Sequence, residues 1–491
     1  MLKPIIARQD ETVVDSGGPT PSVRWALASL SLSMLLSSLG TSIANVALPT
    51  LAQAFTASFQ QVQWIVLAYL LAITTLIVSA GRLGDIVGRR RLLTAGIVLF
   101  TAASIMCGVA PTLWLLIAAR AAQGLGAAVM MTLTLAFVGE IVPKEKTGSA
   151  MGLLGTMSAI GTALGPSLGG ILIAGLGWRA IFLINLPLGI LTLLLAYRSL
   201  PIDRRQPKAA QPGFDTAGTL LLALTLGAYA LAMTMGRGRF GPLNVMLLLA
   251  AGFGVGLFIL AERRTTSPLI QLTMFRDLAL SASLIMSALV STVMMATLVV
   301  GPFYLALSLG LDPATVGLVV SVGPLVVAVT GIPVGRMTDR FGARRMAIVG
   351  LIAITVGSFI LSIMPTAFGI PGYVVPLVII TAGYALFQTA NNTAVLADIP
   401  RDRRGVMSGM LNLSRNLGLI TGVSAMGAVF ALASATSDIT TARPEAVAVG
   451  MRITFTVAAA LIVLALAIAV GSRALATHQS PANQLSPRDL A

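Results

Sequence analysis

The sequence predicts an all-α membrane protein of fourteen transmembrane helices, and three observations lead to this fold class. Of the 491 residues, 56% are hydrophobic and only 10% are charged, too few charges for the surface of a soluble protein. Many apolar stretches reach the length of about 20 residues that a bilayer-spanning helix needs. Basic residues also gather on every second connection between these stretches. Since helices satisfy their own backbone hydrogen bonds in lipid, a helical bundle follows.

The apolar stretches define the predicted helices in chain order. They run over 25–48, 62–80, 92–110, 113–139, 148–175, 178–197, 216–235, 242–261, 279–303, 314–334, 346–364, 371–397, 405–433 and 450–472.

The net charge of +15 is explained by membrane topology. With the N-terminus placed in the cytoplasm, 25 of the 32 basic residues fall on the cytoplasmic side and five on the outer side. The remaining two, Arg120 and Arg415, lie inside helices. This positive-inside distribution predicts that both termini are cytoplasmic. It also argues against a nucleic-acid partner, because the charge is spread over loops rather than gathered in one patch.

An internal repeat divides the chain. GRLGDIVGRRR at 81–91 and GRMTDRFGARR at 335–345 match at six of eleven positions with an offset of 254. A second set matches at offset 257: Pro143, Gly148, Gly152, Gly161 and Gly165 with Pro400, Gly405, Gly409, Gly418 and Gly422. Because the repeat advances eight helices, we expect two six-helix halves with two inserted helices. Internal repeats of this kind build secondary transporters.

The expected organisation follows from the repeat. It comprises a cytoplasmic tail 1–23, a first half 24–198, linkers with the two inserted helices over 199–278, a second half 279–473 and a cytoplasmic tail 474–491.

Several motifs carry a family resemblance over nearly the whole chain. The 81–91 sequence resembles the loop between helices 2 and 3 of the major facilitator superfamily, and IAARAAQGLGAA (117–128) resembles its helix-4 motif. GTALGPSLGG (161–170) is similar to the helix-5 motif of its antiporters. LGTSIANVALPTL (39–51) and WRAIFLINLPLG (178–189) resemble its fourteen-helix drug:proton antiporter family. The resemblance implies a major facilitator fold and secondary export.

The 81–91 sequence and its copy are the candidate gating loops. The resemblance implies that acid and arginine there hold one conformation and release it in another. The candidate residues are Gly81, Asp85, Gly88, Arg89, Arg90, Asp339, Gly342 and Arg344. The alternative is a tight turn with solvated charges.

The helix-5 motif predicts close helix packing. Gly161, Gly165 and Gly169 recur every four residues and so share one helix face, with Gly155 near it. Pro166 weakens the hydrogen-bond ladder there. The resemblance adds that this contact seals an antiporter against leak.

The two intramembrane arginines are functional candidates, because a charge in lipid is costly. Arg120, with Gln123 one turn away, is a coupling residue in the resembled family; snorkelling to the outer surface is the alternative. Arg415 lies near mid-depth between Asn412 and Asn416. This trio either binds substrate or holds helices together by hydrogen bonds.

The chain departs from the family pattern in helix 1. Gly40 stands where the family usually has an acid, and Ser42 where it has a threonine. All 17 acids fall in loops, tails or at helix ends, and arginine does not titrate in practice. We therefore expect a neutral, zwitterionic or anionic substrate. Glu140 and Asp398 are the candidate proton carriers, with Asp312 a third; the alternative is a solvated helix-end charge.

The candidate substrate cavity combines polar and aromatic side chains. Its residues are Asn45, Tyr69, Tyr384, Gln388, Asn412, Arg415 and Asn416. Core packing is the alternative for Tyr69, Tyr384 and Gln388.

The predicted function is a proton-coupled exporter of drugs and similar small amphiphiles, in a bacterial inner membrane. No catalytic constellation, metal site or phosphate-binding loop is present in the sequence, so an enzyme or an ATP-driven pump is not expected. The expected partners are substrate, protons and the lipid bilayer. No cofactor is expected, because the proton gradient drives transport. One alternative is a metabolite or anion transporter without proton antiport, and another is a non-transporting sensor or scaffold. The oligomeric state is left open.

Overall fold

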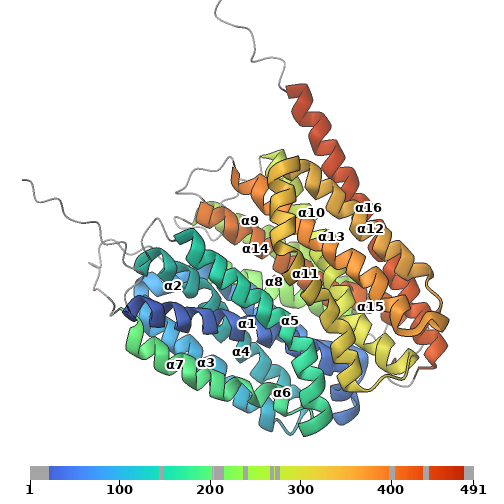
Figure 1. Cartoon of the computed structure of the whole chain (residues 1–491), viewed down its shortest axis with the longest axis horizontal. Helices are drawn as coiled ribbons and strands as arrows, with labels where there is room; N and C mark the ends of the chain where they lie inside the picture. The colour runs from blue at the N-terminus through green and yellow to red at the C-terminus, as the bar shows by residue number, and fades with distance from the viewer. Residues whose placement is uncertain are drawn as a thin grey trace, which may run out of the picture.

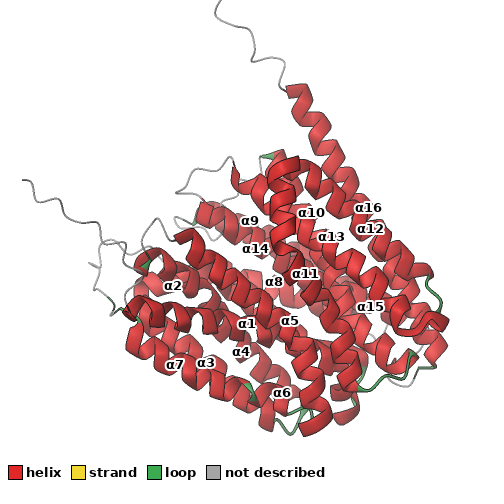
Figure 2. Ribbon diagram, in the orientation of Figure 1, coloured by secondary structure: helices red, strands yellow, loops and turns green. Residues whose placement is uncertain are grey.

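A computed structural model describes residues 21–142, 147–201, 203, 215–235, 241–265, 270, 277–397, 404–434, 439 and 442–479. Within these residues the chain is helical and contains no strand (Figure 2). It contains fourteen helical spans long and apolar enough to cross a membrane, which confirms the predicted fold class for the described residues.

The first half is built from seven helical pieces. They are α1 (Pro21–Ala54), α2 (Phe59–Val87), α3 (Arg89–Val109), α4 (Leu113–Ile141), α5 (Thr147–Leu176), α6 (Ala180–Leu183) and α7 (Asn185–Ser199). The inserted pair is α8 (Thr216–Thr234) and α9 (Pro242–Arg264).

The second half repeats the arrangement with two π-helical segments. It comprises α10 (Leu278–Phe303), η4 (Tyr304–Ser308), α11 (Pro313–Phe341), α12 (Ala343–Ile363), a short 3₁₀ turn η5 (Thr366–Phe368), α13 (Gly369–Ala397), α14 (Arg404–Thr421), η6 (Gly422–Met426), α15 (Gly427–Ala433) and α16 (Pro444–Gln479).

Irregular segments interrupt or extend three of the predicted helices. The stretch 178–197 is not one continuous helix, because it breaks at Ile184 between α6 and α7. Pro187 lies one turn beyond Leu183 and has no N–H to donate to it, so the hydrogen-bond ladder is interrupted there. The predicted stretch 279–303 continues into the π-helical segment η4, and the stretch 405–433 contains the π-helical segment η6. Apolar periodicity does not reveal either segment.

Corresponding helices of the two halves pack in the same pairs. α1 packs on α5 and α2 on α4 in the first half, as α10 packs on α14 and α11 on α13 in the second. The inserted α8 packs on α9 and on α2, where the Trp64 indole N–H donates to the Thr234 hydroxyl at 3.1 Å. The inserted pair is therefore attached through α8, mainly to the first half and to a smaller extent to η6 and α15 of the second.

The halves meet near one end of the bundle, here called the far end, where α1 finishes. There Phe59 of α2 packs edge-on against Phe303 of α10, with ring centroids 4.8 Å apart. Beside it the Gln63 side chain donates to the Val423 carbonyl at 2.7 Å. Figure 1 shows the two halves diverging from this contact toward the opposite end, here called the terminal end, where α1 begins and α16 finishes.

Candidate functional site

Arg120 of α4 lies fully inside the first half, with 0% of its surface exposed. Its Nε donates to the Ile65 carbonyl of α2 and one terminal nitrogen, Nη1, donates to the Gly40 carbonyl of α1, both at 3.0 Å. Nη1 also donates to Gln123 Oε1 at 2.6 Å. The snorkelling alternative is therefore wrong, because the guanidinium joins three helices instead of reaching the surface.

Aromatic rings complete the surroundings of this arginine. The Arg120 guanidinium lies 4.1 Å from the ring centre of Tyr69 and 6.0 Å from that of Phe182. The Tyr69 hydroxyl donates to the Ser37 carbonyl at 2.8 Å, and Gln123 donates to the Ser104 hydroxyl at 2.7 Å. Cation–π contacts and carbonyl acceptors thus stabilise a guanidinium that has no ion pair to any described carboxylate. Its Nη2 has no hydrogen-bond partner among the described residues.

Gly40 of α1 leaves little room for a side chain. A Cβ at position 40 would lie 3.1 Å from Phe100 Cζ and 3.2 Å from the Tyr69 hydroxyl. The space beside Arg120 is thus filled by aromatic groups. The described carboxylates all lie outside or at the ends of the spans, as the sequence predicts for them.

Arg415 of α14 has different surroundings. Its side chain is exposed, and neither it nor Asn412 nor Asn416, both half-buried, forms a hydrogen bond or ion pair within the described residues. On α13, Tyr384 and Gln388 are half-buried, and Gln388 Oε1 has no partner in the part of the chain that is described. The second half therefore presents polar groups with free hydrogen-bonding capacity.

Two other predicted cavity residues lie in the core of the first half. Asn45 is 1% exposed, and its amide donates to the Thr41 carbonyl at 3.3 Å. Tyr69 is fully buried beneath Arg120. In this conformation the structure does not bring them to an open surface with Arg415.

The gating loop of the first half contains a charged network. Arg89 Nη2 lies 2.9 Å from Asp85 Oδ1, and its Nη1 lies 3.5 Å from Glu140 Oε2 at the end of α4. Asp85 and Arg89 flank the sharp connection between α2 and α3, which turns at Gly88 with φ 107°. Gly81 lies one turn before Asp85 and faces the α4 side chain of Thr132.

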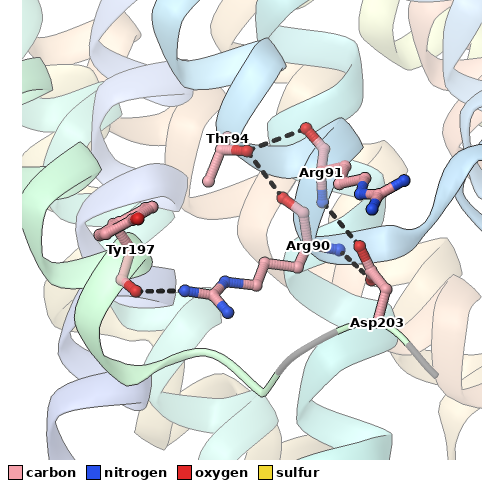
Figure 3. A pocket seen from close by; sticks show the side chains of 5 residues that line it. All are labelled: Arg90, Arg91, Thr94, Tyr197 and Asp203. Carbon is pink, nitrogen blue, oxygen red and sulfur yellow. Dashed lines mark hydrogen bonds between the residues drawn. The ribbon is translucent and has the colours of Figure 1, made fainter.

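Asp203, from the linker after α7, contacts this loop and was not singled out from the sequence. Its carboxylate accepts from the backbone N–H of Arg90 at 2.8 Å and of Arg91 at 3.1 Å (Figure 3). A Cβ at Gly88 would lie 2.5 Å from Asp203 Oδ2, so the glycine makes room for the carboxylate. The sequence feature that could have indicated this contact is the start of α3, which has three arginines and no acidic residue in its first turn. Such a helix start needs an acceptor from elsewhere.

The copy of this loop in the second half lacks these contacts. Gly342 has φ 88°, yet nothing described lies within 4 Å of a Cβ built on it. Asp339 and Arg344 are exposed and have no ion pair within the described residues. Asp398, the counterpart of Glu140, lies outside the described residues.

The helix-5 glycines pack directly on α1. A Cβ at Gly161 would lie 2.5 Å from the Leu35 carbonyl oxygen, and one at Gly169 would lie 2.8 Å from Val46 Cγ1. A Cβ at Gly165 would likewise collide with the Ser42 side chain. Gly155 does not share this contact, since nothing described lies within 4 Å of its Cβ position.

At the far end α5 also meets the second half. A Cβ at Gly317 of α11 would lie 2.9 Å from Gly170 Cα, and it would also meet the Pro166 carbonyl. The motif segment 161–170 therefore contacts α1 on one side and α11 on the other.

Asp312, the third candidate proton carrier, caps the start of α11. Its carboxylate accepts from the Thr315 hydroxyl at 2.6 Å and from the N–H groups of Ala314 and Thr315. Hydrogen bonds from Thr315, then from Ala314, hold the pKa of the Asp312 carboxyl below its ordinary value. The described residues contain no group of three or more Cys, His, Asp and Glu side chains that could hold a metal ion.

The chain matches the family model of the Major Facilitator Superfamily over residues 30–423 and 283–488. It is 33% identical over 410 residues to the multidrug resistance protein Stp of Mycobacterium tuberculosis, covering 82% of this chain and 75% of that protein. It is 32% identical to the uncharacterized transporter YebQ of Escherichia coli, covering 83% and 89%. It is 31% identical to the riboflavin transporter RibZ of Clostridioides difficile, covering 83% and 88%.

Solved structures share the fold. A bacterial homolog of the human lysosomal transporter Spinster, in an inward-facing and unoccupied conformation, superposes with a TM-score of 0.69 at 17% identity, covering 93% of this chain and 98% of that one. A D-xylose–proton symporter superposes with a TM-score of 0.64 at 14% identity, covering 91% and 97%.

Proposed function

The chain belongs to the major facilitator superfamily and within it to the fourteen-helix drug:proton antiporter family, and from this premise we propose that it exports small amphiphilic molecules in exchange for protons. The membrane in this proposal is a bacterial inner membrane, with both termini in the cytoplasm. Transport proceeds by alternating access between the two six-helix halves.

The observation that carries the proposal is the position of the contacts between the halves. They join at the far end through Phe59 with Phe303 and through Gly170 with Gly317, and the halves diverge toward the terminal end (Figure 1). With cytoplasmic termini this is an inward-facing state, ready to take substrate from the cytoplasm. Export then requires the far-end contacts to separate and the gating loops to approach the opposite half.

Orientation can be tested with introduced cysteines, because the native Cys107 is buried. Arg345 and Arg179 are exposed and lie at the terminal and far ends. In intact cells we expect a membrane-impermeant maleimide to label Arg179→Cys and to spare Arg345→Cys. The reverse pattern would overturn the proposed orientation.

Transport can be tested in everted membrane vesicles from cells with and without the protein. We expect uptake of amphiphilic dyes that needs an imposed proton gradient and collapses with an uncoupler. Loss or overproduction of the protein should change the susceptibility of cells to the same compounds. A vesicle preparation that shows no gradient-dependent uptake of any tested amphiphile would remove the export proposal.

Proton coupling is proposed to pass through carboxylates at the ends of the spans, since Arg120 cannot release its proton at ordinary pH. Glu140 is exposed at the terminal end and contacts Arg89, so its charge and the gating loop can respond to each other. A Glu140→Gln, Asp398→Asn, Asp312→Asn triple variant should lose gradient-driven export while still binding substrate. Wild-type coupling in that variant would exclude all three residues.

A second candidate function is transport of a neutral or anionic metabolite. It is favoured by exposed Arg415 and by the fact that carboxylates within the described spans lie only at the span ends. The similarity to a riboflavin transporter also supports this second candidate function. Comparing vesicle uptake of ethidium, riboflavin and fluorescein as cationic, neutral and anionic probes separates the two candidates. Preference for ethidium that survives Arg415→Ala would reject the second.

A further inference from the structure

A surface cavity of about 260 Å³ lies at the terminal end, between the start of α3 and the end of α7 (Figure 3). Its lining residues are Arg90, Arg91, Thr94, Tyr197 and Asp203. It is separate from the Arg120 and Arg415 regions, and the transport proposal does not use it.

The cavity carries excess positive charge. Arg90 donates to the Tyr197 carbonyl and lies 5.3 Å above the Tyr197 ring centre, so one guanidinium is fixed at the cavity wall. Arg91 is exposed and has no ion pair within the described residues. The carboxylate of Asp203 is already committed to the backbone N–H groups of Arg90 and Arg91. A guanidinium offers five N–H donors, so this wall retains unused donors for an anion.

The cavity also adjoins the apolar outer surface of the bundle. Tyr197 is 69% exposed, and its amphipathic ring suits the boundary between lipid and water. One helical turn from Thr94 lies exposed Val98 on α3, and one turn from Tyr197 lies exposed Leu194 on α7. A molecule held in the cavity by its polar end could lay hydrocarbon chains along these two helices.

We propose that this cavity binds the phosphate-bearing headgroup of an anionic phospholipid, with the phosphate on Arg90 and Arg91, the rest of the headgroup beside Tyr197, and the acyl chains along α3 and α7. Basic pockets between membrane helices suit such headgroups. Because Arg90 lies at the start of α3 and Asp203 accepts hydrogen bonds from the backbone there, lipid bound here would stabilise the α2–α3 turn.

The test is a titration of the purified full chain with phosphatidylglycerol in micelles of a neutral lipid, read as the rise in unfolding temperature and as lipid adducts in native mass spectra. Each arginine near an anionic lipid contributes about 1 kcal/mol, or roughly fivefold in affinity. We therefore expect Arg90→Gln/Arg91→Gln to bind phosphatidylglycerol about 25-fold more weakly. Tyr197→Leu tests the aromatic part of the site and should also weaken binding.

The matched control is Arg344→Gln/Arg345→Gln, because Arg344 and Arg345 are the repeat counterparts of Arg90 and Arg91 at the same end of the bundle. This control should bind the lipid like the wild type. An equal loss in the control would mean general charge attraction and would overturn the site. So would unchanged binding by the Arg90/Arg91 variant, or an equal effect of phosphatidylcholine. If glycerol phosphate alone reproduced the temperature rise, the site would take a free phosphate, and the lipid proposal would fail.

Discussion

Arg120 of the first half and Arg415 of the second are the two arginines that the sequence places deep within membrane spans, and they have opposite surroundings. Arg120 in the first half is fully buried and donates to carbonyls of two neighbouring helices. Arg415 in the second half is exposed and has no partner among the described residues. The same fold thus uses one guanidinium to join helices and leaves the other free to meet a ligand.

The gating loops differ in the same sense. Gly88 and Gly342 both have positive φ, so the duplicated turns share their backbone conformation. Only the first is contacted by a linker carboxylate, that of Asp203, and only the first has a described ion-pair network. The repeat therefore preserves backbone geometry while side-chain contacts diverge, and paired substitutions can measure that divergence.

The largest expected difference is between Arg120→Ala and Arg415→Ala. Removing the buried guanidinium leaves a cavity and breaks a hydrogen-bond network, which should cost about 2–5 kcal/mol and abolish transport. Removing the exposed one should change stability by less than about 0.5 kcal/mol while altering substrate preference. Thermal unfolding in detergent and vesicle transport measure both. Equal destabilisation would show that Arg415 also has structural partners.

The helix contacts should behave alike in the two halves. Gly161 lies against the Leu35 carbonyl of α1, and its repeat counterpart Gly418 lies against the Ala288 carbonyl of α10. Valine at either position must push neighbouring backbones apart, which should cost about 1–3 kcal/mol and reduce transport. Gly155→Val is the control, since its Cβ position is empty within 4 Å. Equal unfolding temperatures for Gly161→Val and Gly155→Val would contradict the α1–α5 packing.

These comparisons also show what the sequence could predict. Apolar length and the repeated glycines at 161 and 165 are local patterns, so the spans and the close α1–α5 packing could be read from them. The partners of Arg120 are backbone carbonyls, which every residue has, so no pattern marks Ile65 or Gly40 as acceptors. Asp203 reaches Gly88 across more than a hundred residues, and only the three-dimensional fold brings them together.

Alanine at the two turn glycines isolates the Asp203 contact. Both substitutions place a Cβ at positive φ, which costs about 1–2 kcal/mol. Only at Gly88 would the Cβ also meet Asp203, so Gly88→Ala should be more destabilising than Gly342→Ala. Asp203→Ala alone should lose about 0.5–2 kcal/mol of capping and should remove the additional cost of Gly88→Ala. Additive costs in the double variant, measured by thermal unfolding, would argue against the contact.

The smallest expected difference concerns two helix caps related by the repeat. Ser58 caps α2 with an uncharged hydroxyl, whereas Asp312, at offset 254, caps α11 with a carboxylate. Because hydrogen bonds from Thr315 and Ala314 lower the pKa of Asp312, its capping contribution is complete above the unfolded-state pKa of about 4. It is lost as the pH falls through the lower folded-state value. The wild type should therefore lose slightly more stability below about pH 4 than Asp312→Ser, whose cap does not titrate. Unfolding temperatures measured from pH 6 to 3 compare the two proteins, and parallel curves would mean that the cap contributes nothing charge-dependent.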